Sequence, residues 1–283
     1  MILHAAIGDA YGAGFEFAPA DLIAAENTLT QYRPHLIYPE ICGRYTDDTQ
    51  MALAICELIL SGDEWTPERI ADGFVATFKR DPRRGYSSRL YEILTQVNSG
   101  KELISSIRNN SDRNGAAMRA FPIGMYPDVE EVLAKADLQA RITHDTEVAR
   151  TSAKAVALMA HGLYHGNVEP EELGTFVESH LPGDWRQDWN AEVTMLATDA
   201  VFAALTLIRN CSSLPEMLQK GIAFGGDVDT VGAITLGCAA LSHHIEMDLP
   251  DWMDSNLENG AFGRDYLVSI DLQLILRYPG RSL

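Results

Sequence analysis

The spacing of apolar side chains along most of the chain is typical of α-helices. Leu3, Ala6, Ile7 and Ala10 recur at intervals of three and four residues, as one buried helix face requires. Similar spacing predicts helices over 2–13, 48–62, 66–78, 90–97, 148–163, 170–179, 191–209 and 214–223, with a further helix after Asp229. Glycines mark two expected ends, because Gly62 and Gly100 each follow the last apolar position of a predicted helix.

Near the end of the chain the pattern changes. Alternate positions from Tyr266 to Leu274 are apolar, which predicts a short strand. At least eight helical patterns against at most one strand predict an all-α protein, folded as a single domain over residues 1–283.

Two acidic segments are candidate metal sites. Gly225-Gly226-Asp227-Val228-Asp229-Thr230 places two carboxylates and a hydroxyl within four residues, directly before a helix rich in small side chains. Thr46-Asp47-Asp48 repeats this chemistry at the start of an earlier helix. Each alone is also what a helix cap with an acidic first turn looks like. Taken together they favour one site for hard divalent cations, which prefer oxygen ligands and relieve the repulsion between carboxylates.

The first predicted helix is interrupted by Gly8, Gly12 and Gly14. Each glycine costs a helix roughly 1 kcal/mol, so three of them suggest close backbone packing or a ligand nearby. Glu16 follows between two phenylalanines, an unusual place for a carboxylate, although a solvated loop glutamate is the alternative.

Three further features are weaker signals for a binding site. The turn-rich segment 80–87 is basic within an acidic protein, so it faces either solvent or an anionic ligand. Segment 114–119 begins with Asn-Gly and small residues, which can present backbone N–H groups to a phosphate. His144 precedes the long helix over 148–163, where a lone histidine is more often structural than functional.

The composition limits the kinds of partner and the cellular compartment that we expect. The net charge is −18, which argues against nucleic acid as the main partner, because binding to its phosphates needs a basic protein surface. The four cysteines are scattered along the chain and form no CxxC pair, which is typical of proteins in a reducing compartment. The N-terminal stretch lacks the basic region of a signal peptide, and the chain has no run of about 18 apolar residues, so a cytoplasmic protein without a membrane span is expected.

The ordered set of motifs resembles the ADP-ribosylglycohydrolase family, which includes the enzyme that removes ADP-ribose from dinitrogenase reductase. The matching residues lie between residues 2 and 245: Gly8-Asp9 with Gly12 and Glu16, Thr46-Asp47-Asp48, Asn114-Gly115-Ala116-Ala117-Met118-Arg119, Thr143-His144, and Asp227 with Asp229 and Thr230. Two features depart from the family pattern. Only seven residues precede Gly8, so a short first helix is expected, and Arg113 stands where a glycine commonly precedes the phosphate-loop asparagine.

The resemblance implies a fold, a cofactor and a reaction. The fold would be a compact orthogonal helical bundle with a binuclear centre of two divalent cations, Mg²⁺ or Mn²⁺. The reaction would be hydrolysis of the bond between ADP-ribose and a side chain of a modified protein, through an oxocarbenium-like ribose. Six residues would be the metal ligands: Thr46, Asp47, Asp48, Asp227, Asp229 and Thr230.

The resemblance also assigns roles to other residues. Glu16 would orient or deprotonate the attacking water, and Asp81 would accept the guanidinium of an arginine-linked substrate. Contacts to ADP-ribose would come from Gly85, Tyr86, Asn114, Gly115, Ala116, Met118, Arg119 and His144.

Two other functions compete with this interpretation. Asp227-Val228-Asp229-Thr230 looks like the Asp-x-Asp motif of haloacid-dehalogenase-type phosphatases. That motif follows an apolar strand in an α/β fold, whereas two glycines precede it here. A non-catalytic ADP-ribose-binding or toxin-immunity protein of the same fold would have lost a metal ligand, and all six are present.

Overall fold

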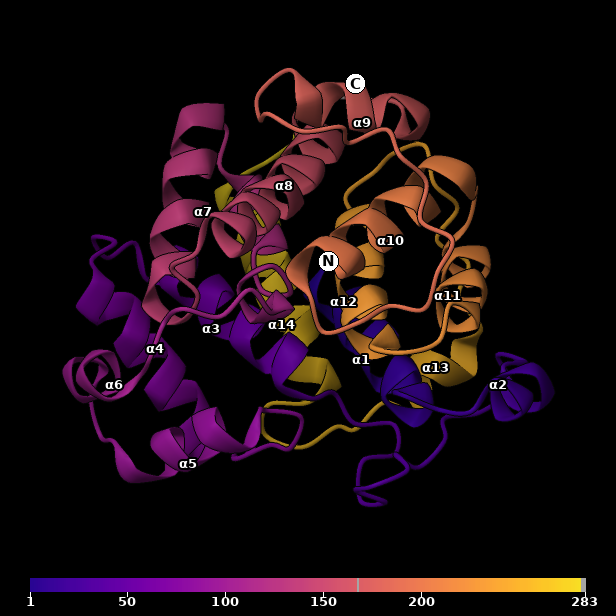
Figure 1. The fold of residues 1–283 in the computed structure, drawn as a ribbon, viewed down its shortest axis with the longest axis horizontal. Coiled ribbons are helices and arrows are strands. Elements are labelled where there is room, and N and C mark those ends of the chain that lie inside the picture. The colour runs from indigo at the N-terminus through magenta and orange to yellow at the C-terminus, as the bar shows by residue number, and fades with distance from the viewer. Residues whose placement is uncertain (167, 281–283) are drawn as a thin grey trace.

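The computed structural model describes residues 1–166 and 168–280, which form helices joined by loops (Figure 1). The α-helices are α1 (Ile2–Gly12), α2 (Ala20–Glu26), α3 (Asp47–Ser61), α4 (Pro67–Arg80), α5 (Ser88–Gln96), α6 (Gly100–Ser106), α7 (Val129–Thr143), α8 (Glu147–Tyr164), α9 (Leu173–Glu178), α10 (Ala197–Asn210), α11 (Leu214–Ala223), α12 (Val228–Ala239), α13 (Asp251–Ser255) and α14 (Arg264–Arg277). Short 3₁₀ helices are η1 (Ala13–Phe15), η2 (Asn114–Ala116), η3 (Phe121–Met125) and η4 (Pro170–Glu172). The described residues contain isolated β-bridges but no sheet, so the all-α prediction is confirmed.

Helix α12 is the buried centre of the fold. Every one of its residues from Val228 to Ala239 is buried. A helix without a polar face must be covered on all sides, and α1, α8, α10 and α11 all pack against it. Figure 1 shows α12 near the middle of the molecule, with α10 and α11 on one side and α3 and α14 on the other.

Helices α1 and α12 touch through their backbones. A Cβ on Gly8 would lie 2.6 Å from the carbonyl carbon of Gly232, and a Cβ on Gly232 would lie 2.8 Å from that of Gly8. The interpretation of these glycines as a sign of close packing is therefore confirmed for Gly8. The helices run antiparallel, since Gly12 lies against Asp229, so the end of α1 meets the start of α12.

The predicted C-terminal strand is wrong, because this segment is helix α14. Its buried side chains are Leu267, Ile270 and Leu274, spaced by three and four residues. Leu272 is 58% exposed although it is apolar. The apolar residues of this segment thus belong partly to the buried face of a helix and partly to its exposed side. Together they alternate along the sequence as the apolar residues of a strand do.

Two other predicted boundaries also differ. Gly100 does not end a helix but begins α6, capped by the hydroxyl of Ser99. The helix predicted over 191–209 begins only at Ala197, and the residues before it are extended. None of the described helices is both long and apolar enough to cross a lipid bilayer.

Candidate functional site

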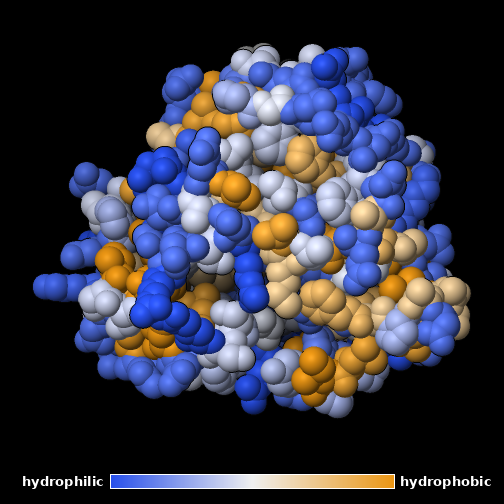
Figure 2. Space-filling model, in the orientation of Figure 1, coloured by the Kyte–Doolittle hydropathy of each residue, from blue (hydrophilic) through white to orange (hydrophobic). Residues whose placement is uncertain are grey.

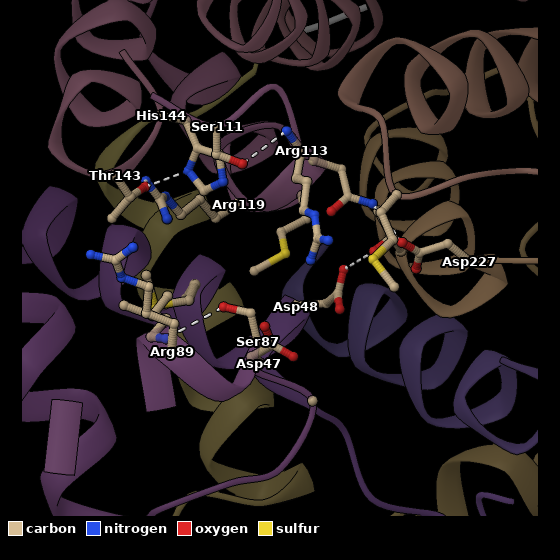
Figure 3. Close-up of a pocket in the computed structure, with 18 of the residues that line it drawn as sticks. Asp47, Asp48, Ser87, Arg89, Ser111, Arg113, Arg119, Thr143, His144 and Asp227 are labelled. Atoms are coloured by element: carbon tan, nitrogen blue, oxygen red, sulfur yellow. Dashed lines mark hydrogen bonds between the residues drawn. The ribbon is translucent and has the colours of Figure 1, made fainter. Parts of the chain in front are cut away.

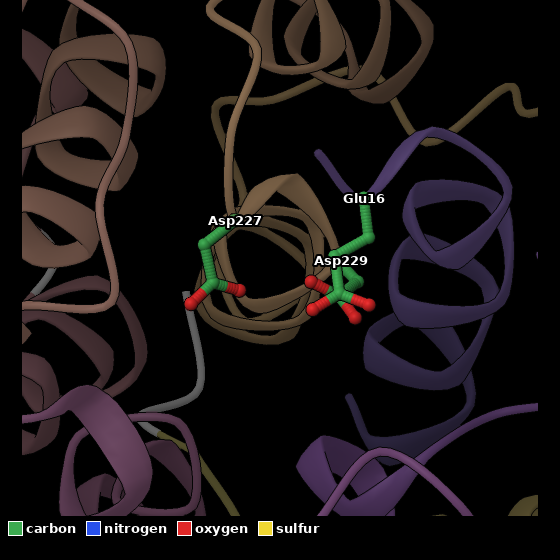
Figure 4. A group of neighbouring side chains, drawn as sticks. All are labelled: Glu16, Asp227 and Asp229. Carbon is green, nitrogen blue, oxygen red and sulfur yellow. The ribbon is translucent and has the colours of Figure 1, made fainter. Parts of the chain in front are cut away.

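The crossing of α1 and α12 brings three carboxylates together. Glu16 follows η1 at the end of α1, Asp227 is the N-cap of α12, and Asp229 lies in its first turn. One carboxylate oxygen from each lies within 4.8 Å of the others (Figure 4). Carboxylate oxygens at this separation can share a cation.

The two acidic segments predicted from the sequence meet at this point. The hydroxyl of Thr230 donates to Oδ1 of Asp48 at 2.7 Å, across 182 residues of sequence. The hydroxyl of Thr46 donates to the other Asp48 oxygen at 3.3 Å, and Asp47 is the first residue of α3. All six predicted ligands therefore belong to the starts of α3 and α12, which face one another.

Asp9 holds the start of α3 in place, a role that the sequence did not reveal. Its carboxylate accepts hydrogen bonds from the backbone N–H groups of Thr46 and Thr49 and from the Thr49 hydroxyl at 2.6 Å. Burial raises the pKa of Asp9 to about 6, although these hydrogen bonds act in the opposite direction. Asp9 is thus a buried anchor between α1 and α3.

The acidic cluster consists of Glu16, Asp47, Asp48, Asp227 and Asp229. Bringing these carboxylates together is electrostatically unfavourable in the absence of cations. Burial, and after it the charges of Asp47 and Asp9, raises the pKa of Asp48 well above its usual range. Burial, and after it the charge of Glu16, does the same to the pKa of Asp229. Oxygen donors that repel one another in this way are suited to hard divalent cations, which would supply the missing positive charge.

An extended segment before α10 ties the acidic cluster to the predicted phosphate loop. The backbone of Val193 exchanges hydrogen bonds with Gly225 and Asp227, and the carbonyl of Met195 accepts from the N–H of Asn114. Gly226 has a φ of +82°, and a Cβ there would lie 2.8 Å from the carbonyl carbon of Val193, so only glycine fits. This backbone bridge explains why residues 191–196 are not helical.

Asn114 completes the connection through its side chain. Its amide Nδ2 donates to Oδ2 of Asp227 at 2.9 Å. The predicted phosphate loop and the predicted metal segment are therefore in direct contact.

These elements surround a cavity of about 450 Å³. Figure 2 shows a hollow just below the middle of this face, with strongly hydrophilic side chains beside it. Residues lining the cavity include Glu16, Asp47, Asp48, Met51, Gly85, Ser87, Arg89, Arg108, Arg113, Asn114, Gly115, Met118, Arg119, Thr143, His144, Asp227, Asp229 and Thr230.

Charges of opposite sign line the cavity. Arg89, Arg108 and Arg113 are exposed arginines on its wall, in a protein with a net charge of −18. Figure 3 shows Arg89 and Asp227 on opposite sides of the cavity, with the Arg113 side chain extending into it. The cavity therefore offers cations to one part of a ligand and carboxylates to another.

A buried network fixes His144 at the edge of the cavity. Arg119 is fully buried and donates to Oε1 of Gln139 and to the Thr143 hydroxyl, which in turn lies 2.7 Å from Nδ1 of His144. Burial lowers the pKa of Arg119 to about 9. Burial, and after it the charges of Arg119 and Arg113, lowers the pKa of His144 to about 3, so this imidazole is neutral. A Cβ on Gly115 would lie 2.7 Å from the Cε1 atom of His144, so glycine makes room for the ring.

Four predicted site residues do not line this cavity. The carboxylate of Asp81 is bonded to Arg83 at 2.6 Å, and Tyr86 is buried with its hydroxyl donating to Gln50. The predicted contacts of Asp81 with a guanidinium and of Tyr86 with ADP-ribose are therefore not supported by this arrangement. Ala116 and Thr46 are buried and are not among the residues that line the cavity.

The comparisons with known proteins agree with these motifs. The model of the ADP-ribosylglycohydrolase family matches residues 1–281. The chain belongs to the ADP-ribosylglycohydrolase family. The resemblance inferred from the motifs is therefore confirmed, and a haloacid-dehalogenase-type fold is excluded.

The relatives of this protein match different shares of its length. ADP-ribosylhydrolase ARH3 of Xenopus tropicalis is 31% identical over 191 residues, which are 64% of this chain and 53% of that protein. ADP-ribosylarginine hydrolase Tri1 of Pseudomonas putida is 23% identical over 272 residues, 89% of this chain and 72% of that protein. The match thus spans about half the length of the ARH3 relative.

A solved structure shares the fold. It is described as an ADP-ribosylglycohydrolase-related protein complex, and it superposes with a TM-score of 0.73 at 23% identity. The superposition covers 96% of this chain and 94% of the other. At this identity the likeness shows the fold, and the chemistry has to be argued from the site.

Proposed function

We propose that this protein is a metal-dependent hydrolase that removes ADP-ribose from modified side chains of proteins. The observation that supports it is the division of one cavity into an acidic wall and a basic wall. ADP-ribose has a matching division, because a dianionic pyrophosphate joins an adenosine to a distal ribose whose hydroxyl groups are ligands for cations.

Two divalent cations, Mg²⁺ or Mn²⁺, would be held by the starts of α3 and α12. The proposed ligands are those expected from the motifs: Thr46, Asp47, Asp48, Asp227, Asp229 and Thr230. When bound, such ions would hold oxygens of the distal ribose and a water molecule and would lower the pKa of that water. The raised pKa values of Asp48 and Asp229 support this assignment, since burial and the charges of neighbouring carboxylates raise them and a bound cation would relieve that repulsion.

The other wall of the cavity would hold the pyrophosphate and the adenosine. Exposed Arg113 precedes the phosphate loop, where it adds a cation that the family pattern lacks. Gly115 and Met118 line the cavity beside it, and neutral His144 offers a hydrogen bond without a charge. Binding of the nucleotide would thus depend on residues that are separate from the acidic cluster.

Glu16 is the proposed base. As the bond between C1″ of the ribose and the side-chain nitrogen or oxygen breaks, the ribose becomes oxocarbenium-like and the leaving group takes up a proton. Water adds to C1″, and Glu16 accepts the proton that the water loses. Glu16 then returns this proton to solvent, which supplies the proton that the leaving group takes up, so the step is balanced. This role is supported by the separation of at most 4.8 Å between a carboxylate oxygen of Glu16 and those of Asp227 and Asp229, which would hold the metal beside the ribose.

The arginine linkage is the proposed preference. Relatives named ADP-ribosylarginine hydrolase Tri1 match 88–89% of this chain. A guanidinium leaving group would also meet an acidic wall, and carboxylates are the natural partners of a guanidinium. Asp81 has no part in this proposal, because its carboxylate is bonded to Arg83.

The test is turnover of defined substrates. Peptides with ADP-ribosylated arginine or ADP-ribosylated serine are incubated with the protein and Mg²⁺, and released ADP-ribose is measured. We expect release from the arginine peptide at the higher kcat/KM, loss of release in EDTA, and recovery on addition of Mg²⁺ or Mn²⁺. Full activity after exhaustive chelation would contradict the metal requirement.

Two further outcomes separate the alternatives. Tight binding of ADP-ribose without release from either peptide would indicate a non-catalytic binding protein. Release from the serine peptide alone would contradict the arginine preference but not the hydrolase activity. Glu16→Gln should lose most of kcat and still bind ADP-ribose, because its proposed role concerns the water rather than the nucleotide.

A further inference from the structure

A buried histidine lies against the proposed base. His35 belongs to the loop between α2 and α3 and is only 5% exposed. Its Nε2 atom lies 2.6 Å from Oε2 of Glu16. This residue could not be recognised from the sequence, since a lone histidine in a loop has no pattern around it.

The surroundings of His35 fix where its ring proton lies. The backbone N–H groups of Ile37 and Tyr38 both donate to Nδ1, at 2.9 and 3.1 Å. An atom that accepts two hydrogen bonds holds no proton of its own, so the proton of the neutral ring is on Nε2. The Nε2–H group therefore donates to Glu16, which leaves the other carboxylate oxygen available.

The loop that carries His35 is itself attached to the segment before Glu16. Arg33 donates from its guanidinium to the carbonyl of Gly14 at 2.9 Å. On the other side of Glu16, the N–H of Phe17 donates to the carbonyl of Gly226, next to the acidic cluster. Both flanks of Glu16 are thus anchored, and the bond from His35 fixes the remaining freedom of its side chain.

We propose that His35 is a positioning residue for Glu16: its Nε2–H group holds the carboxylate in the orientation that accepts the proton of the attacking water. This role rests on the proposed function. A purely structural alternative is that His35 serves only to close its own loop through Nδ1. The two roles use different nitrogens of the ring, so they can be separated by substitution.

Two variants separate the roles of the nitrogens. In His35→Asn the amide oxygen can replace Nδ1 as the acceptor for Ile37 and Tyr38, but the side chain is too short to reach Glu16. In His35→Gln the amide nitrogen can replace Nε2 as the donor to Glu16, whereas the loop loses its acceptor. The measurements are Tm, kcat and KM on the substrate that the wild-type protein hydrolyses.

We expect His35→Asn to keep a Tm close to wild type and to lose about 10- to 100-fold in kcat with little change in KM, the usual effect of losing such a supporting hydrogen bond. His35→Gln should have a lower Tm and recover kcat to within about threefold of wild type. In a Glu16→Gln background, His35→Asn should have no further effect on kcat, because the two residues act as one unit.

Three outcomes would overturn the role of His35. They are wild-type kcat in His35→Asn, an equal loss of kcat in both variants, or additive losses in the double variant. A long-range ¹H–¹⁵N correlation spectrum of the protein without metal gives a test that needs no turnover, and a proton on Nδ1 of His35 would contradict the proposal. A wild-type protein that is inactive on both peptides overturns the proposed function instead, and the role of His35 with it.

Discussion

Gly12 of α1 and Asp229 of α12 are in contact through their backbones. A Cβ on Gly12 would lie 2.7 Å from the backbone nitrogen of Asp229, well inside the contact distance of two such atoms. The position of the Asp229 carboxylate in the acidic cluster therefore depends on the absence of a side chain at residue 12.

Gly12→Ala should disrupt the site and destabilise the protein. The added methyl group has to push α1 away from α12, and overpacking of this kind costs about 1–3 kcal/mol. We expect a lower Tm together with loss of most hydrolase activity. Gly73→Ala is the matched control, because a Cβ there meets only the carbonyl oxygen of Ala54, at 3.9 Å, inside α4. That variant should gain about 0.5–1 kcal/mol, and an equal effect of both substitutions on Tm would contradict this explanation.

Asp48→Asn should stabilise the protein without metal and abolish its response to metal. Asp48 is buried among other carboxylates that raise its pKa, so a neutral amide of the same shape removes repulsion. We expect the unfolding free energy at pH 7.5 without metal to rise by about 1–2 kcal/mol. The increase in Tm that saturating Mg²⁺ gives the wild-type protein should shrink or vanish, because ions that bind only the folded state stabilise it. A less stable Asp48→Asn protein without metal would show that the cluster is not under repulsion.

Arg119→Lys should weaken substrate binding more than it slows turnover. Lysine cannot replace the three hydrogen bonds that Arg119 donates to Gln139 and Thr143, and each buried acceptor left without a partner costs about 1–3 kcal/mol. His144 loses the support of Thr143 as a result. We expect KM to rise about tenfold and Tm to fall, whereas the same change at Arg69, which is exposed on α4, should alter neither. A change confined to kcat would place Arg119 in a different role.

The ion pairs of Asp137 predict a dependence of stability on acid. Partial burial acts to raise the pKa of Asp137, but hydrogen bonds from Lys154, Arg141 and Arg150 outweigh it and hold the pKa at about 2. The unfolded value is about 3.9, so the folded pKa is depressed. The stabilisation is therefore present in full above about pH 5 and is lost as the pH falls from about 4 to about 2.

Asp137→Asn checks this window. It should lower the unfolding free energy by about 1 kcal/mol at pH 6, and the difference from wild type should decrease towards pH 3 in urea titrations. A difference that stays constant from pH 6 to pH 3 would show that the ion pairs are not its cause.

The sequence predicted those parts of the site in which chemistry is concentrated in a few neighbouring residues. The sequence predicts that the two acidic segments form one site, and the hydrogen bond between Thr230 and Asp48 joins them. The hydrogen bond between Asn114 and Asp227 was not predicted. Acidic segments of this kind can be recognised without the fold, because repulsion between adjacent carboxylates requires an explanation wherever they lie.

The parts that the sequence did not reveal depend on contacts between distant segments. Asp9 and His35 each act through a single side chain whose partner is set by the fold, and the extended bridge at Val193 uses only backbone atoms. Asp81 is the opposite case. It lies in a basic, turn-rich loop that indicated a binding site, but its carboxylate forms an ion pair with Arg83, two residues later.

The antiparallel crossing of α1 and α12 also constrains how the chain acquires its site. Glu16, Asp48 and Asp229 come from segments that lie far apart in the sequence, and no fragment that ends before residue 229 contains all three. The site therefore cannot form before α12 has been synthesised. Contacts between segments so far apart in the sequence form slowly compared with local helices. Because α12 is buried along its whole length and also carries Asp229, the packing of the core and the completion of the site depend on the same helix.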